Sequence, residues 1–174
     1  DTDDASKLIG CINALSKQVL GDEGIIKSTD PDPMQRAVAF CQTIKVSKKI
    51  TNTFNTTAEL YLNDLHDKKK NQMVSVSSRH MDGTMNAPYR DELLSWLKSS
   101  DNDPDVCRVL TNVRCLSEGV DVPSLDSVMF LSPRNSQIDV VQSVGRVMRK
   151  ADGKKYGYII IPVVIPSDVT PAKA

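Results

Sequence analysis

Cys107-Arg-Val-Leu-Thr-Asn-Val113 is a short, largely apolar run with the length of a buried strand, and it leads into a turn-rich segment that ends at Pro123. Further runs of strand length occur on both sides of it. The sequence therefore predicts strands at residues 36–41, 73–78, 107–113, 127–131 and 156–165.

Helical spacing separates most of these runs. Apolar residues three and four positions apart predict helices at 4–20, within 44–66, after Asn86, and from Ser136 to about Lys150. Strands that alternate with helices predict an α/β fold, in which a mostly parallel sheet carries helices on both faces. In such sheets ligands gather beyond the carboxyl ends of the strands.

The predicted elements divide the chain into three parts. Residues 1–35 form an N-terminal helix and connector, residues 36–165 form the α/β domain, and residues 166–174 form a flexible tail. The chain does not begin with Met, so we expect a fragment of a longer protein.

The charge and composition of the chain limit the classes of function that it can have. The 174 residues carry 22 basic and 22 acidic side chains, but residues 134–155 hold six bases against two acids. Such a local concentration of positive charge can bind phosphate, although a solvated basic surface is the alternative. The sequence has no apolar run of about 20 residues and no Cys-x-x-Cys pair, so we expect a cytoplasmic protein with no membrane partner, no zinc site and no metal-ligating residues in this chain.

The segment around the end of the third strand can contact sugar and phosphate. Thr111 and Asn112 offer a hydroxyl and an amide that suit a phosphate backbone. Gly119 permits a tight backbone turn, and the Asp121 carboxylate can accept hydrogen bonds from sugar hydroxyls. Taken alone, however, this segment is better explained as an ordinary turn.

The helix predicted after the fourth strand carries Gln142, Arg146 and Arg149 at spacings of four and three, so these side chains share one face. Two neighbouring guanidinium groups repel each other unless an anion lies between them, and their planar donors match phosphate oxygens. A surface helix whose arginines pair with acids elsewhere is an equal alternative for this helix alone.

Together these segments resemble the C-terminal RecA-like domain of superfamily 2 helicases and translocases, over residues 36 to about 164. The resemblance is carried by residues 36–41 (motif IV), 80–83 with Arg90 (the next conserved segment), 111–123 (motif V) and 142–149, which match the Q-x-x-G-R-x-x-R form of motif VI. The ending at 153–163 looks like the helicase parts of restriction–modification proteins.

The resemblance implies a role for each matching residue. Arg149 is expected to be the arginine finger, with Arg146 beside it on the γ-phosphate of ATP. Gln142, Gly119 and Asp121 are expected near the nucleotide. Thr111 and Asn112, with Arg90, are the expected nucleic-acid contacts.

The sequence contains no G-x-x-x-x-G-K-[ST] loop to hold phosphates. We therefore expect ATP and Mg²⁺ to be bound mainly by a preceding RecA-like domain of the same polypeptide, and this chain alone to be inactive. DNA is favoured over RNA, because Gln142 stands where the RNA-dedicated DEAD-box branch usually has His. The alternatives are an inert RecA-like docking module and an unrelated doubly wound nucleotide-binding domain.

Overall fold

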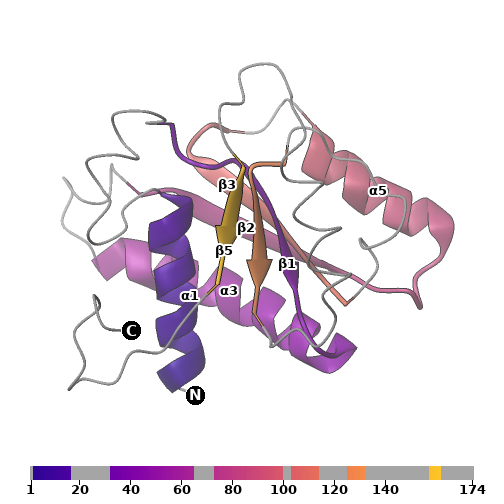
Figure 1. Cartoon of the computed structure of the whole chain (residues 1–174), viewed down its shortest axis with the longest axis horizontal. Helices are drawn as coiled ribbons and strands as arrows, with labels where there is room; N and C mark the ends of the chain where they lie inside the picture. The colour runs from indigo at the N-terminus through magenta and orange to yellow at the C-terminus, as the bar shows by residue number, and fades with distance from the viewer. Residues whose placement is uncertain are drawn as a thin grey trace.

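The computed structural model of the chain describes residues 2–16, 32–64, 73–99, 103–113, 125–131 and 157–161. Within these ranges it contains three helices and five strands (Figure 1), which are, in chain order, α1 (Thr2–Leu15), β1 (Arg36–Phe40), α3 (Ile44–Asp64), β2 (Ser75–Met81), α5 (Ala87–Lys98), β3 (Val106–Asn112), β4 (Ser127–Phe130) and β5 (Tyr158–Ile160).

The five strands form one sheet in the order β2-β3-β1-β4-β5, and every neighbouring pair is parallel. The α/β fold with a mostly parallel sheet is thereby confirmed. Consecutive strands β1 and β2 are separated by β3, so the connections must cross over the sheet, and helices are the usual way to make such crossovers.

Side chains of β1 alternate between two hydrophobic clusters, because successive residues of a strand point to opposite faces of the sheet. Ala37 and Ala39 belong to the cluster that includes Phe54 of α3. Val38 and Phe40 belong to the other cluster, in which the Phe40 ring stacks on Phe130 of β4 with the ring centroids 5.8 Å apart. A strand that is buried on both faces reads as a continuous apolar run, as residues 37–40 of β1 do.

The helices cover both faces of the sheet. Helices α1 and α3 pack on one side, where Ile12 and Leu15 of α1 join Phe54 of α3 in the core. Helix α5 lies on the opposite side, where Leu93 and Leu97 are buried (Figure 1). The sheet is therefore the middle of three layers.

Arginines from the sheet hold the C-terminal end of α5. The Arg36 guanidinium donates to the carbonyl oxygens of Leu97, at 2.9 Å, and Ser99, at 2.6 Å. Arg108 of β3 donates to the carbonyl oxygen of Trp96, and the Arg79 guanidinium lies 4.5 Å from the centre of the Trp96 ring. Positive charge is favourable at the C-terminal end of a helix, so these contacts fix α5 on the sheet.

Several predicted boundaries differ from the structure. The sequence predicts the second strand at 73–78, but β2 runs from Ser75 to Met81, because residues as far as His80 and Met81 still pair with Thr111 and Asn112 of β3. The turn that leads to α5 therefore begins only after Met81. Helix α1 ends at Leu15 rather than at residue 20. The strand predicted at 156–165 is found as β5 at Tyr158–Ile160, and residues 156 and 162–165 lie outside the described residues.

Candidate functional site

Four strand ends meet in one row, at the edge of the sheet where ligands are expected. Phe40 at the end of β1 pairs with Asn112 of β3 on one side and with Phe130 of β4 on the other. Asn112 in turn pairs with Met81 of β2. Whatever follows each of these strands in the sequence therefore starts at this carboxyl edge.

Thr111 and Asn112, two of the predicted nucleic-acid contacts, are completely buried at this edge. The Thr111 hydroxyl is hydrogen bonded to the hydroxyl of Thr51 on α3 and lies 3.3 Å from the carbonyl oxygen of Arg79. The Asn112 amide donates to the carbonyl oxygen of Ala39 at 3.1 Å. Contact with a phosphate stays a prediction for both residues, and it would require these side chains to leave their internal partners.

Arg90, the third predicted contact, is partly buried near the start of α5. This end of α5 lies at the carboxyl edge because the helix follows β2. The sequence predicts a helix after Asn86, and in the structure the Asn86 side chain caps it by accepting a hydrogen bond from the Tyr89 amide at 2.9 Å. The Nε atom of Arg90 is buried, and within the described ranges it has no hydrogen-bond partner.

Tyr89 is a candidate site residue that the sequence reasoning missed. Tyr89 is 45% exposed beside Arg90, although large aromatic residues usually bury most of their surface. The available signal was the pair of neighbouring aromatic and cationic residues in the first helical turn after Pro88. Such a pair can contact a base or sugar together with a phosphate.

A chain of buried polar side chains joins α3 to the turn that follows β2. The Ser47 hydroxyl lies 2.7 Å from Nδ1 of His80, and Nε2 of His80 contacts the Asp82 carboxylate. The other Asp82 oxygen accepts hydrogen bonds from the amide and the hydroxyl of Thr84. Because Ser47 is fully buried, this serine, histidine and aspartate hold the turn in place rather than forming an accessible nucleophile.

These partners set the charge state of Asp82. Its burial raises the pKa, but hydrogen bonds from Thr84 and His80, together with the nearby charge of His80, outweigh burial and lower the pKa from 3.8 to about 2. Asp82 is therefore ionised at every pH at which the protein is expected to work.

We expect Asp82→Asn to destabilise the fold by about 1–2 kcal/mol at pH 7. Because folding lowers the pKa, the stabilisation by Asp82 is present above the unfolded pKa of 3.8 and is lost as the pH falls through the folded value of about 2. Urea denaturation of parent and variant at pH 7 and pH 3 measures this difference, with the exposed Asp91→Asn as control. A difference that is equally large at both pH values would contradict the assignment.

The sequence reasoning also missed the polar stripe of α3. Ser47, Thr51 and Asn55 recur at intervals of four, so they share one helix face. Asn55 accepts a hydrogen bond from the Ser78 amide at 2.8 Å and donates to the Ser78 carbonyl oxygen at 3.1 Å. This contact satisfies backbone groups of β2, which is an edge strand. Polar residues at helical spacing were the available signal.

The remaining predicted site residues, Gln142, Arg146, Arg149, Gly119 and Asp121, lie outside the described residues. The strands that lead to them are described, however. Both β3 and β4 pair with β1, one on each side, and both end at the carboxyl edge. The segment after β3 and the segment after β4 therefore start from positions that flank the end of β1.

The sequence matches a family model, and the fold matches solved structures. The model of the helicase conserved C-terminal domain matches residues 19–151. The ATP-dependent Type ISP restriction-modification enzyme LlaBIII, in a structure bound to DNA, is 40% identical over 98% of this chain, with a TM-score of 0.77. Domain 2 of the DEAD-box helicase Mss116p, bound to an RNA duplex, has 18% identity and a TM-score of 0.55 over 91% of this chain and 50% of its own, and so shows the fold alone.

A shorter stretch matches a curated protein. "Probable helicase A859L" of African swine fever virus (isolate Pig/Kenya/KEN-50/1950) is 37% identical over 60 residues, which are 34% of this chain. The match covers 7% of that viral protein, and the chain spans 10% of the restriction–modification enzyme. None of the helices in the described parts of the chain is long and apolar enough to cross a membrane.

The parallel sheet, the order of its strands and the family match over residues 19–151 lead to one assignment. The chain belongs to the helicase conserved C-terminal domain family and has the RecA-like fold of superfamily 2 helicases.

Proposed function

We propose that the chain is the second motor domain of an ATP-dependent nucleic-acid helicase or translocase. In this proposal it supplies Arg146 and Arg149 to ATP bound by a preceding RecA-like domain, and its carboxyl edge contacts the nucleic-acid backbone. The observation that carries the proposal is the position of β1 between β3 and β4. This strand order supports the proposal that the segment with Asp121, which follows β3, and the segment with Arg149, which follows β4, start at the same edge of the sheet.

The proposed role of the arginines follows from the negative charge that develops during phosphoryl transfer. Negative charge spreads over the γ-phosphate oxygens in the transition state, and an arginine that reaches them is worth about 10³–10⁵ in rate. Arg149 would act as the finger, with Arg146 next to it. Gln142 would contact the nucleotide, and Gly119 and Asp121 would lie near its ribose.

The chain's own residues fit a shared nucleotide site rather than a complete one. The sequence has no phosphate-binding Gly-Lys-Ser/Thr loop. Among the described residues at the carboxyl edge, the buried carboxylate is Asp82, and His80 and Thr84 already occupy it. We therefore place the phosphates and the Mg²⁺ of ATP mainly in the preceding domain, where Mg²⁺ would neutralise phosphate charge.

DNA is the favoured nucleic acid in this proposal. The relative with 40% identity over nearly the whole chain is a restriction–modification enzyme bound to DNA. Position 142 is Gln rather than the His that is usual in the RNA-dedicated branch. A motor that moves along duplex DNA in restriction–modification is consistent with both observations.

The proposal is tested by measuring ATP hydrolysis by the complete protein that contains this chain. We expect duplex DNA to stimulate hydrolysis more strongly than RNA of the same length, and the isolated chain to show no turnover. If the complete protein binds DNA but hydrolyses no ATP with or without it, the chain is an inert docking module and the proposal is wrong.

A further inference from the structure

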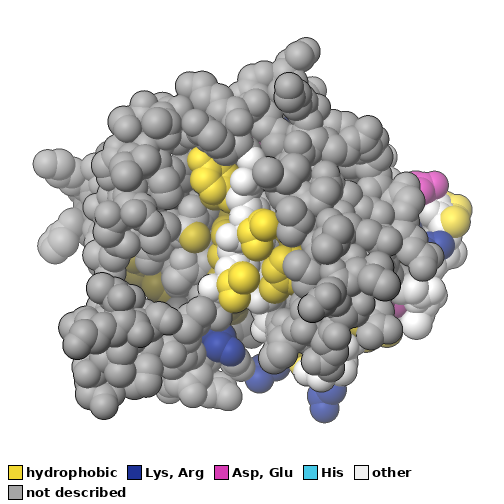
Figure 2. Space-filling model, in the orientation of Figure 1, with side chains coloured by type: hydrophobic (Ala, Val, Ile, Leu, Met, Phe, Trp, Pro, Cys, Tyr) yellow, Lys and Arg dark blue, Asp and Glu magenta, His cyan; other side chains and the backbone are white. Residues whose placement is uncertain are grey.

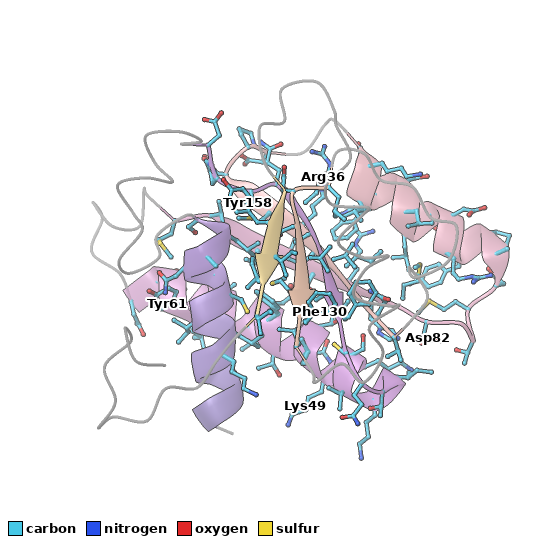
Figure 3. All side chains as sticks on the ribbon, viewed as in Figure 1. Arg36, Lys49, Tyr61, Asp82, Phe130 and Tyr158 are labelled. Carbon is cyan, nitrogen blue, oxygen red and sulfur yellow. The ribbon has the colours of Figure 1, made fainter. Side chains whose placement is uncertain are left out.

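The first two turns of α3 carry three exposed lysines, Lys45, Lys48 and Lys49. Their spacing of three and four residues places them on one face of the helix, about 5–6 Å apart at their Cβ atoms. Figure 3 shows the labelled Lys49 on the side of α3 that faces away from the sheet, and Figure 2 shows dark blue side chains along the lower edge of the molecule, in the direction of this helix.

This arrangement of charge is unfavourable for the helix itself. The first turn of α3 contains no acidic residue and the last turn contains no basic one. Lys45 lies at the positive end of the helix dipole, whereas Asp64 lies at the negative end, so both charges oppose the dipole. Like charges at spacings of three and four also repel each other. A sequence that breaks local rules in this way often does so for function.

Acidic residues in the described part of the chain do not neutralise Lys45 and Lys48. The acidic residues of α3, Glu59 and Asp64, lie in its C-terminal half. Asp82 is near the same end of α3 as the lysines, because its partner His80 contacts Ser47, but it is only 1% exposed and is bound to His80 and Thr84. The positive charge of Lys45 and Lys48 is therefore directed at solvent.

The lysines adjoin the edge at which the proposed nucleic-acid contacts lie. Helix α3 follows β1, so its first turns lie at the carboxyl edge of the sheet. The hydrogen bond between Ser47 and His80 fixes the lysine-bearing turns against the turn at 82–85, which leads into the capped start of α5 with Tyr89 and Arg90. A phosphate backbone that passes Arg90 would meet these lysines next.

We propose that Lys45 and Lys48, with Lys49 beside them, form a binding site for the phosphodiester backbone of duplex DNA. This inference rests on the proposed function and adds a contact that lies outside the segments carrying the helicase resemblance. The site takes phosphate through charge alone, without reading bases, and it extends the DNA contact from α5 across the turn at 82–85 to α3.

The test compares two double variants of the complete protein in DNA binding at several salt concentrations. Each lysine that neutralises a phosphate contributes about 0.9 to the slope of log K against log salt. Lys45→Gln with Lys48→Gln should therefore reduce the slope by about 2, and weaken binding roughly tenfold or more at about 0.1 M salt. Lys7→Gln with Lys98→Gln removes the same charge from α1 and from the opposite end of α5, and should leave both values near those of the parent.

Unfolding in urea shows whether a loss of DNA binding comes from the missing lysines or from a less stable fold. Because the lysines oppose the helix dipole, the variant with Lys45→Gln and Lys48→Gln should unfold at the same or a higher urea concentration than the parent. An unchanged slope, or an equal loss in the control variant, overturns the lysine site. If the parent shows DNA-stimulated ATP hydrolysis in the same preparation, such a result leaves the proposed function intact.

Discussion

Arg149→Ala should lower the DNA-stimulated kcat for ATP hydrolysis of the complete protein by at least about 10³-fold, while ATP binding changes little. The loss corresponds to about 4 kcal/mol of transition-state stabilisation. The guanidinium would act on charge that develops only as the γ-phosphate is transferred, so its removal should not affect the ground-state affinity for ATP. Turnover under saturating ATP and DNA, together with the Kd of a fluorescent ATP analogue, measures both effects.

Two further variants distinguish a specific role of Arg149 as arginine finger from a general effect of removing positive charge. Arg149→Lys keeps the charge but loses the planar fork of donors, so we expect it to recover only a small part of the activity. Lys150→Ala removes a neighbouring charge that would point about 100° away on the helix predicted from Ser136 to about Lys150, and it should keep nearly parental turnover. Near-normal kcat in Arg149→Ala would refute the role of Arg149, whatever the behaviour of DNA binding.

Features that depend on nearby residues could be predicted from the sequence. Asn86 and Pro88 indicate the start of α5, and the helix begins at Ala87 with the Asn86 side chain as its cap. The apolar run of β1 predicts a buried strand, and all five of its residues are buried. In both cases the signal and the structure that it specifies lie within a few residues of each other.

Features that depend on distant residues could not be predicted in this way. His80 and Met81 stand in a turn-like sequence context, but pairing with Thr111 and Asn112 keeps them in β2. Thr111 is polar and lies near the end of a strand, which favours a surface donor. Its hydroxyl instead meets Thr51, which is 60 residues away in the chain. Only the order of the strands brings α3 over this position.

A contact between distant residues was also unpredictable at the amino edge of the sheet. In the sequence Arg36 is only the residue that precedes an apolar run, and nothing near it indicates a partner. In the structure Arg36 supports α5. Arg36 is 9% exposed, and its guanidinium donates to the carbonyl oxygens of Leu97 and Ser99 at the C-terminal end of that helix. Figure 3 shows Arg36 and Asp82 at opposite ends of the sheet, so a contact at the amino edge fixes the helix whose other end carries Arg90.

Arg36→Met should destabilise the fold by about 2–4 kcal/mol, because two carbonyl oxygens at the end of α5 lose a charged donor and the helix dipole loses a compensating charge. Met keeps much of the aliphatic length, so the loss reports on the guanidinium. Urea denaturation followed by circular dichroism should show a midpoint lower by about 1–2 M.

Arg79→Met is the matched control, since Arg79 is exposed and contributes its side chain to the face of the Trp96 ring. A contact of this kind at an exposed site is worth about 0.5–1 kcal/mol, so the control should lose much less stability. Equal losses in the two variants would mean that the buried hydrogen bonds of Arg36 do not hold α5. A larger loss for Arg36→Met, together with weaker DNA binding under conditions where the variant remains folded, would show that the position of Arg90 depends on a residue at the far edge of the sheet.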